Sequence, residues 1–396
     1  MVVLEHKGIT AMPDGGRQLT REIDLDALAA FGDWEEGTPE LGPASQRRPG
    51  RGAVSNPAPR FEATTTVAAP DDWTALTADL PPLQTILSRD KSKSAISWND
   101  SPDLGFDRAV NPYRGCEHGC VYCYARPSHA YLGFSPGLEF ETQIVYKPNV
   151  AALLEHELSR PGYVPRTMAL GSNTDPYQPV DRTLRLTRAV LEVLDRYNHP
   201  VSIVTKSAGV LRDLDVLTRM AARGLVRVWV SVTTLDGDLA RRMEPRASSP
   251  ALRLQTLRAL QAAGVPAGVL AAPMIPGLND MELEQILRAA RDRGITHAGY
   301  VLLRLPHELR DIFTAWLHEH VPGRAQRVLT LIRDTRAGDL NDSQFGKRFV
   351  GEGPYAVMLG QRFKRVQREL GFAGRERLDA TQFRAPARPV AQLSLL

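Results

Sequence analysis

Cysteine is scarce in this sequence. Three cysteines occur among 396 residues, and all three lie between positions 116 and 123. Because an odd number of cysteines cannot pair off within one chain, a framework of internal disulfides is excluded. Thiolates are soft ligands that suit zinc and iron–sulfur clusters, so three of them on one short segment indicate a bound metal.

Long apolar runs and a strong charge imbalance are also missing. No stretch of about 18 apolar residues occurs, so the sequence predicts no membrane span. The N-terminus lacks the long apolar segment of a signal peptide, and we expect a cytoplasmic protein whose thiols stay reduced. The net charge of +4 is too small to indicate nucleic-acid binding by itself.

The charge is nevertheless uneven along the chain. From Val321 to the end, 14 basic residues face 7 acidic ones. A basic surface of this kind can contact phosphates, but a solvated, arginine-rich helix explains the excess equally well.

The segment before residue 96 shows little regular pattern. We expect residues 1–95 to form a largely irregular extension to which no chemistry is assigned. Residues 37–59 are rich in Pro, Gly, Arg and Ser, which is typical of a flexible linker. Short helices are predicted at 25–31 and 81–88.

Strand and helix signals alternate regularly across residues 96–320. After a first strand that ends near Asn111, the predicted strands are 167–170, 201–205, 226–232, 267–272 and 299–303. The predicted helices between them are 150–158, 182–197, 211–223, 251–263 and 281–293. This alternation predicts an α/β fold with a parallel sheet, arranged as a partial TIM-like barrel of six βα units.

The remainder, residues 321–396, is predicted to be a basic helical region with a tail. Helices are expected at 308–318, 325–333 and 357–370. Between the last two lies a glycine-rich basic loop, 346–355, which we expect to wrap the open side of the barrel. Its Lys347 and Arg348 are candidates for phosphate contact.

Polar residues recur where the predicted strands end. In barrels of this type the reactive groups lie at the C-terminal ends of the strands. The first strand ends in the loop 111–124, which carries the three cysteines and is called the cysteine loop below. The later strand ends hold residues 173–175, Lys206, 231–234, 276–280 and Arg304. The sequence therefore predicts an active-site rim at that end of the barrel.

Two metal sites are compatible with the cysteines. A [4Fe–4S] cluster has four irons, so ligation by Cys116, Cys120 and Cys123 leaves one iron open for a small molecule. A structural zinc site would need a fourth ligand, which His118 or His129 could supply.

The cysteine loop, with its CxxxCxxC spacing and Tyr122 before the last cysteine, resembles the cluster motif of the radical S-adenosylmethionine (SAM) superfamily. The longer string 111–126 resembles the branch that includes spore photoproduct lyase. Supporting similarities lie at 171–177, 202–206, 243–246 and 272–280. The resemblance implies a [4Fe–4S] cluster on the three cysteines and SAM bound at the open iron. It also implies reductive cleavage of SAM to a 5′-deoxyadenosyl radical, with an electron donor such as flavodoxin or ferredoxin.

The resemblance further implies a set of SAM-binding positions. In relatives, the aromatic residue before the third cysteine lies near adenine, the second strand end meets the amino group, and later strand ends meet the carboxylate and ribose. The matching residues here are Tyr122, Ser172, Asn173, Thr174, Asp175, Lys206, Ser231 and Ile275. A core aromatic, ordinary turn chemistry and a solvated lysine remain alternative interpretations of Tyr122, of Asn173 and Asp175, and of Lys206.

One departure concerns the hydrogen-atom donor. Spore photoproduct lyase uses an additional cysteine after its second strand, a position that falls near Ser172 in this sequence. A serine hydroxyl is a poor hydrogen-atom donor, so a tyrosine could substitute. The candidates are Tyr124, Tyr177, Tyr300 and Tyr355.

The resemblance favours DNA or another nucleic acid as the substrate. A radical SAM enzyme acting on a protein or small molecule, and a non-catalytic metal-bound nucleic-acid-binding module, remain alternatives. The final residues Gln392, Leu393, Leu395 and Leu396 resemble the short peptide by which bacterial repair proteins bind the sliding clamp.

Overall fold

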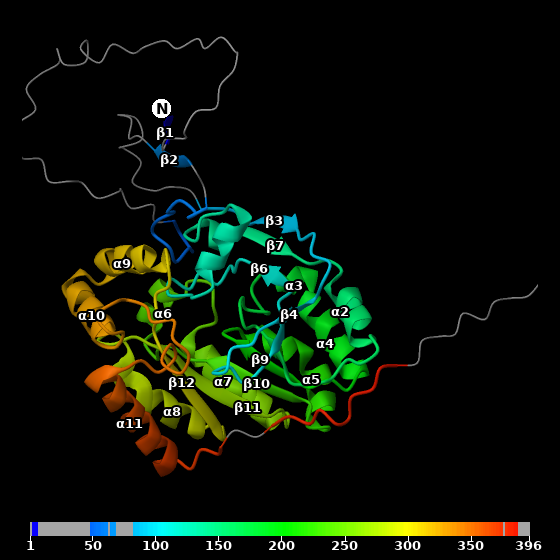
Figure 1. Cartoon of the computed structure of the whole chain (residues 1–396). Coiled ribbons are helices and arrows are strands. Elements are labelled where there is room, and N and C mark those ends of the chain that lie inside the picture. The colour runs from blue at the N-terminus through cyan, green and yellow to red at the C-terminus, as the bar shows by residue number, and fades with distance from the viewer. Residues whose placement is uncertain (1, 7–47, 62–63, 69–81, 375–376, 387–396) are drawn as a thin grey trace, which may run out of the picture.

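The structure is a computed structural model that describes residues 2–6, 48–61, 64–68, 82–374 and 377–386. Its centre is a seven-stranded sheet with the strand order β12-β11-β10-β9-β8-β5-β4 (Figure 1). Six neighbouring strands run parallel, and β4 pairs antiparallel with β5 at one edge. The sheet strands are β4 (Ile96–Trp98), β5 (Arg108–Val110), β8 (Met168–Leu170), β9 (Val201–Thr205), β10 (Val226–Ser231), β11 (Ala267–Met274) and β12 (His297–Leu302).

Helices follow these strands and cover the outside of the sheet (Figure 1). The helices of the barrel are α2 (Val150–Leu158), α3 (Asp181–Leu184), α4 (Leu186–Arg196), η4 (Ala208–Asp213), α5 (Leu214–Ala221), α6 (Gly237–Met243), α7 (Pro250–Ala262), η5 (Asp280–Glu282) and α8 (Leu283–Arg291). Strands such as β9 and β10 are rich in β-branched residues, as expected for parallel strands buried on both faces. The predicted partial barrel of six βα units is confirmed.

Further elements surround this barrel. A small sheet has the order β3-β7-β6, formed by β3 (Ile86–Arg89), β7 (Gln143–Tyr146) and β6 (Tyr113–Arg114), and β1 (Val2–His6) pairs with β2 (Thr64–Ala68). The cysteine loop leads into η3 (Arg126–Leu132) and α1 (Glu139–Thr142). The C-terminal helices are α9 (Leu309–His320), α10 (Pro322–Asp334) and α11 (Gly353–Glu369).

The apolar core has two main parts. One fills the space between the sheet and its helices, with Leu191, Ile203, Val228 and Leu257 among its buried members. The other joins the cysteine loop to α9 and α10, where Trp316 is fully buried. Since α9 and α10 pack on the cysteine loop, the helical C-terminal region also supports the site. No helix among the described residues is long and apolar enough to cross a membrane.

Several predicted elements differ from the structure. The predicted helix 182–197 is interrupted at Arg185, whose backbone is left-handed (φ 50°) between α3 and α4. The break allows Asp181 Oδ1 to accept hydrogen bonds from Tyr113 Oη (2.5 Å) and the Thr187 N–H (3.1 Å). The helix predicted at 81–88 is wrong for its described part, because residues 86–89 form β3, which pairs with β7. The helix predicted at 25–31 lies outside the described residues.

The prediction of a flexible linker at 37–59 is also wrong for residues 51–54, which lie in the described part of this segment. Residues 51–54 are buried against the barrel. The Arg51 guanidinium donates to the Glu141 carbonyl (2.7 Å), and the N–H groups of Gly52 and Ala53 donate to the Glu141 carboxylate (2.9 and 2.8 Å). A buried carboxylate needs such donors, so it fixes a segment whose composition is typical of a linker.

Candidate active site

The cysteine loop is held by buried charged side chains. Glu141 is fully buried and pairs with the equally buried Arg126. The Arg126 guanidinium also donates to the carbonyls of Cys120 (2.9 Å), Pro136 (3.0 Å) and Gly137 (2.8 Å). Breaking a buried pair of this kind leaves an uncompensated charge, which is strongly destabilising. The pair therefore fixes the backbone of the central cysteine.

Gly119 lets the loop turn within this network. Its φ is +67°, in the left-handed region that favours glycine. A Cβ added there would lie 2.7 Å from Oε2 of Glu141, closer than van der Waals contact permits. Both the backbone angle and the available space therefore require glycine.

Glu117 ties the same loop to the second strand end. Its N–H donates to Oε1 of Gln178 (2.9 Å), and its carboxylate accepts from Thr85 Oγ1 (2.6 Å) and the Val180 N–H (2.6 Å). Arg246 completes the set with an ion pair at 3.1 Å. Each carboxylate oxygen thus has a partner, and the loop has a single arrangement.

Residues 243–246, noted from the sequence only as a supporting similarity, hold the loop from the other side. The Val121 N–H donates to the Met243 carbonyl (3.0 Å). Glu244, buried and paired with Arg253, accepts a hydrogen bond from Thr233 Oγ1 (2.7 Å). That hydroxyl shares a further hydrogen bond with Tyr122 Oη (3.1 Å), so a chain of hydrogen bonds fixes the tyrosine before the third cysteine.

The three thiols are neighbours in a largely apolar setting. Burial raises the pKa of the Cys116 thiol, and so do the charges of Asp175 and the other two cysteines. Burial also raises the pKa of Cys120, and the Lys206 ammonium opposes this effect. Each thiol is thus close enough to influence the others, and metal binding would displace their protons.

This donor set fits a [4Fe–4S] cluster. Among the described residues, no three His, Cys, Asp or Glu side chains are gathered around a point where one metal ion could sit. A cubane differs from a single ion, because each thiolate binds an iron of its own. Three thiolates and no fourth cysteine would leave one iron without a protein sulfur. Cys120 and Cys123 line a large cavity, so a cluster on this loop would border that cavity.

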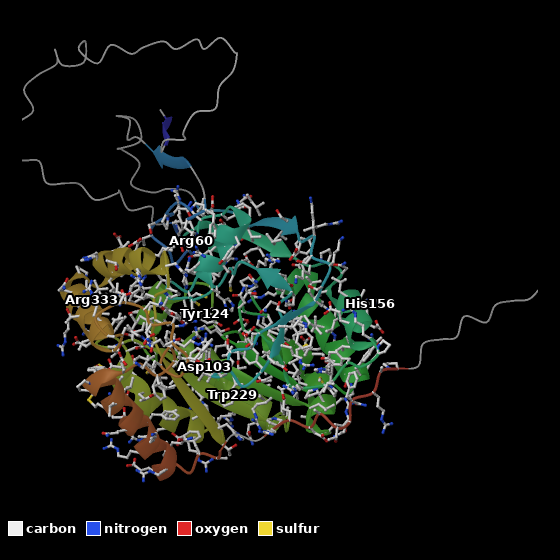
Figure 2. The ribbon with its side chains drawn as sticks, viewed as in Figure 1. Arg60, Asp103, Tyr124, His156, Trp229 and Arg333 are labelled. Carbon is white, nitrogen blue, oxygen red and sulfur yellow. The ribbon has the colours of Figure 1, made fainter. Side chains whose placement is uncertain are left out.

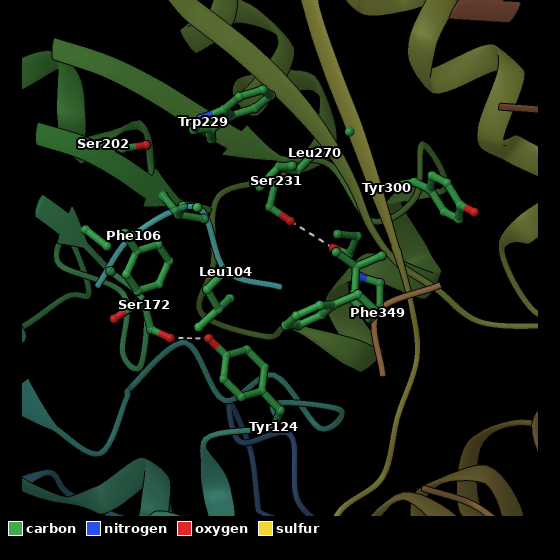
Figure 3. Close-up of a pocket in the computed structure, with 18 of the residues that line it drawn as sticks. Leu104, Phe106, Tyr124, Ser172, Ser202, Trp229, Ser231, Leu270, Tyr300 and Phe349 are labelled. Carbon is green, nitrogen blue, oxygen red and sulfur yellow. Dashed lines mark hydrogen bonds between the residues drawn. The ribbon is translucent and has the colours of Figure 1, made fainter. Parts of the chain in front are cut away.

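The cavity has a volume of about 840 Å³ and extends into the barrel. That size is within the usual range for small-molecule sites, roughly 300–1,000 Å³. Its wall carries Ser172, Lys206 and Ser231 at successive strand ends, and Figure 3 shows Leu104, Phe106 and Phe349 among the side chains around it. In Figure 2, Asp103, Tyr124 and Trp229 come from distant parts of the chain and share the central region.

Most residues proposed to bind SAM lie on this cavity. Those that line it are Tyr122, Ser172, Asn173, Lys206 and Ser231. The Lys206 ammonium lies 5.6 Å from the ring centroid of Tyr122, within the range of a cation–π contact. Ser231 donates to the Ala272 carbonyl (2.8 Å), as drawn in Figure 3. These residues come from the cysteine loop and three different strand ends.

Three other proposed residues do not line the cavity. Thr174 is buried and donates to the Tyr113 carbonyl (3.0 Å). The Ile275 N–H donates to Oδ1 of Asn279 (2.6 Å), and its side chain is fully buried. Asp175 is likewise enclosed, so the structure brings these three near the site without exposing them to a ligand.

Asp175 organises the strand ends. Its carboxylate accepts from Thr205 Oγ1 (2.8 Å) and from the Lys206 N–H (2.7 Å), and His118 lies 3.3 Å away. Burial alone would raise the pKa of Asp175, but His118 and these hydrogen bonds lower it to about 2. The carboxylate is thus fully engaged in joining the cysteine loop to the end of β9.

The four candidate tyrosines differ in position. Tyr124 lines the cavity, and its hydroxyl donates to the Ser172 carbonyl (Figure 3). Tyr300 also borders the cavity, but its ring packs on Phe363 of α11, with centroids 4.8 Å apart. Burial raises the pKa of Tyr177, which is enclosed near Asp213, and Tyr355 donates to Oδ2 of Asp280 (2.5 Å). Neither of these two lines the cavity.

Residues 97–106 are part of the site that sequence reasoning missed. They close the open side of the barrel beside the loop 346–355. Asp103 accepts two hydrogen bonds from the Arg348 guanidinium (2.8 and 2.5 Å) and one from the Gly346 N–H (3.1 Å). The sequence carried only a weak signal, namely Leu104 and Phe106 within a turn-rich stretch. The prediction that the basic loop wraps this side agrees with the position of Arg348 and Phe349 on the cavity.

Comparisons with known proteins agree with this geometry. The family model of the radical SAM superfamily matches residues 110–290. An uncharacterized protein of Mycobacterium tuberculosis is 40% identical over 232 residues, which cover 58% of this chain and 68% of that protein. An uncharacterized protein of Methanocaldococcus jannaschii is 28% identical over 192 residues, covering 48% of this chain and 69% of that protein.

A solved structure shares the fold. Spore photoproduct lyase complexed with dinucleoside spore photoproduct superposes with a TM-score of 0.52 at 17% identity, covering 72% of this chain and 79% of that chain. At that identity the similarity concerns the fold alone. The cysteine loop, the partial barrel and the matching family model lead to one conclusion: this chain belongs to the radical SAM superfamily.

Proposed function

We propose that the protein is a radical SAM enzyme that uses a [4Fe–4S] cluster on Cys116, Cys120 and Cys123 to cleave SAM reductively. One observation carries the proposal: the three-thiol loop borders a cavity of about 840 Å³ whose wall consists of polar strand ends. When bound, the cluster would pass one electron from a flavodoxin or ferredoxin to SAM, whose C5′–S bond breaks to give methionine and a 5′-deoxyadenosyl radical.

The chain's own residues would bind and orient SAM. Lys206 is a cation at the cavity wall and suits the SAM carboxylate, while the fixed ring of Tyr122 suits adenine. Asn173 and Ser231 offer polar groups for the amino group and the ribose. Asp175 would act indirectly, because its carboxylate holds the Lys206 backbone. Thr174 and Ile275 would contribute through the backbone of their loops.

A nucleic acid is the substrate that we favour. The similar fold of spore photoproduct lyase, which was solved with a dinucleoside, and the arginines beside the cavity support this proposal. A protein or small-molecule substrate is the second candidate, and a non-catalytic metal-bound module is the third. Among the tyrosines, Tyr124 is the best placed to donate a hydrogen atom, since it lines the cavity beside the cysteine loop.

Two further features, the clamp-binding peptide and the phosphate contacts, remain predictions. The clamp-binding peptide at Gln392, Leu393, Leu395 and Leu396 lies outside the described residues. Phosphate contact by Lys347 and Arg348 would compete with existing ion pairs, to Glu352 (2.7 Å) and Asp103 (2.5 Å) respectively.

Anaerobic reconstitution tests the proposal. After incubation with iron and sulfide, the wild type should hold about four irons per chain, as a cubane requires. It should also release 5′-deoxyadenosine from SAM under reduction. Cys120→Ala should lose both properties, whereas Ser128→Ala, five residues beyond the last cysteine, should keep them. A colourless protein that binds zinc, or a Cys120→Ala variant with full iron content and turnover, would refute the proposal.

A further inference from the structure

Arg304 lies just beyond the end of β12, on the wall of the cavity. Its guanidinium carbon lies 5.4 Å from the ring centroid of Tyr124 and 5.8 Å from that of Phe349. Among the described residues, no carboxylate or carbonyl accepts a hydrogen bond from this guanidinium in the structure. Its five N–H donors are thus available to a ligand in the cavity.

The neighbouring arginines contrast with Arg304. The Arg348 guanidinium is occupied by the Asp103 carboxylate, at 2.8 and 2.5 Å. The Arg336 guanidinium donates to the backbone carbonyls of Leu302 (2.9 Å) and Leu303 (2.8 Å). Three arginines therefore meet at this edge, and Arg304 is the one whose donors are unused.

The charges around Arg304 favour an anion. Burial lowers the pKa of Arg304, and Arg348 lowers it further, whereas Tyr124 and Asp103 raise it. Both oxygens of Asp103 already accept hydrogen bonds from Arg348, so this carboxylate acts on Arg304 only through space. Arg304 is half-buried, and a partly desolvated cation without a hydrogen-bond acceptor gains free energy when an oxyanion binds it.

Exposed aromatic rings lie on the cavity wall and beside Arg348, which also lines the cavity. Trp98, Tyr124 and Phe345 are 61%, 48% and 56% exposed. Each ring has an arginine near its face, with Arg108 at 4.6 Å from Trp98 and Arg348 at 4.9 Å from Phe345. Trp98 and Tyr124 line the cavity. Alternating cations and exposed rings are typical of proteins that bind single-stranded nucleic acid, where bases stack on rings and phosphates meet cations.

We propose that the part of the cavity wall made by Trp98, Tyr124 and Arg304 binds single-stranded nucleic acid with a backbone phosphate on Arg304. A guanidinium matches a phosphate in bidentate geometry, which explains an arginine with free donors at this place. A duplex keeps its bases stacked inward, so the rings would select an unpaired strand. The bound strand is the substrate only if the proposed radical SAM function holds, but its binding is a separate property.

Fluorescence anisotropy on the reconstituted protein tests this site. Three labelled probes share one base sequence: a short single-stranded DNA, the same DNA as a duplex, and a single strand with neutral methylphosphonate linkages. The wild type should prefer the single-stranded phosphodiester, with an affinity that falls as salt rises.

The variants separate phosphate contact from general charge. Arg304→Gln should weaken single-strand binding about tenfold or more, as expected for a charge-assisted hydrogen bond. The single-strand affinity of Arg304→Lys should lie between those of the wild type and Arg304→Gln, because lysine keeps the charge but loses the bidentate geometry. Trp98→Ala should weaken binding about tenfold through lost stacking. Arg327→Gln, which removes an exposed arginine of α10, should bind like the wild type.

Distinct outcomes would overturn the proposal. One is a wild type that does not bind the single strand, and another is an Arg304→Gln variant that binds it as tightly as the wild type. The third is an Arg304→Gln variant that loses as much affinity for the methylphosphonate probe as for the phosphodiester strand. A loss of SAM affinity in Arg304→Gln without a change in DNA affinity would assign Arg304 to the cofactor instead. Iron content and 5′-deoxyadenosine release of the wild type are measured on the same samples. Arg304-dependent binding by a protein that holds no cluster would refute the radical function and support the phosphate site.

Discussion

The two sides of the cavity differ in how their charged groups are satisfied. On the cysteine side, Glu117 and Glu141 are buried and Asp175 is nearly so, and hydrogen bonds or ion pairs occupy their oxygens. At the edge with Arg304, the faces of Tyr124 and Phe349 lie beside the guanidinium, and Trp98 and Phe345 are largely exposed. Satisfied networks hold one arrangement, whereas free donors and exposed rings have binding capacity left for a ligand.

This difference assigns distinct tasks to the two sides. Under the proposed function, the cysteine side would hold its ligands in place before the cluster binds, because misplaced thiolates would not share one cluster. Under the proposed function, the edge with Arg304 would bind and release its ligand in every catalytic cycle. Side chains already satisfied within the protein would compete with a substrate there.

The strongest test of this contrast is Glu141→Gln. The substitution leaves the Arg126 guanidinium buried without its counter-charge, which should lower the free energy of unfolding by about 3–5 kcal/mol. Iron content after reconstitution should fall with it, since Arg126 holds the Cys120 carbonyl. Urea unfolding monitored by circular dichroism measures the first effect and an iron assay the second. Glu192→Gln, from the exposed pair with Arg188, is the control and should cost less than about 1 kcal/mol. Equal losses in the two variants would contradict the contrast.

Acid pH should weaken the barrel while the arginines of the open side keep their charge. Burial lowers the pKa of His199 to about 4, and the imidazole packs near Tyr163 and Phe383. The unfolded chain takes up this proton below about pH 6.5, whereas the folded chain stays neutral down to about pH 4. His199 should therefore lower the free energy of unfolding by about 3 kcal/mol as pH drops through that window, and the buried His129, whose pKa is also lowered to about 4, should add a loss of its own.

His199→Gln should flatten this pH dependence, although its stability at neutral pH is lower. Urea unfolding midpoints between pH 7.5 and 4.5 provide the measurement. The matched control is His156→Gln, whose exposed imidazole on α2 lies at the periphery in Figure 2. A variant at position 199 with the wild-type pH profile would show that another group causes the loss.

Gly119→Ala tests whether the cysteine side also depends on its backbone conformation. An L-residue in the left-handed region costs about 1–2 kcal/mol, and the added Cβ also meets Oε2 of Glu141. We expect a thermal midpoint below that of the wild type and reduced iron retention. Gly323→Ala on α10, where an added Cβ meets nothing within 4 Å, should leave both unchanged.

The smallest expected effect is at the open side, in Asp103→Asn. Removing this carboxylate frees Arg348 and makes the cavity edge more positive. Affinity for single-stranded DNA should rise about two- to fivefold, in line with the modest energy of partly exposed ion pairs. Asp334→Asn, at the exposed end of α10, serves as the control. A decrease in affinity would mean that the position Asp103 gives to Arg348 matters more for binding than the repulsion between its carboxylate and an anion.

Local sequence patterns predicted helices and strands well where apolar periodicity alone decides the conformation. Helix α2 and strand β9 occupy the predicted residues, because apolar periodicity and flanking turns lie within a few neighbouring positions. The same reasoning failed for 81–88, where pairing with β7, some fifty residues away, decides the conformation. It also failed for 51–54, whose order comes from Glu141.

The candidate site shows the same division. The SAM-binding residues were proposed from the family resemblance, most of them at strand ends, and five of the eight line the cavity. Thr174, Asp175 and Ile275 do not, because hydrogen bonding and burial turn them into the protein. Sequence position gives the end of a strand but not the direction in which a side chain finds its partner.

The sequence by itself determined the cysteine loop and the repeated βα pattern, since both are written in short-range spacing that needs no partner. Only the tertiary structure decided that Asp103 engages Arg348 and that no acceptor in the described part of the chain binds Arg304. Asp103 and Arg348 are 245 positions apart in the sequence and meet only through the packing of the folded chain. Contacts of that range follow from the packing of the whole chain, and no local pattern encodes them.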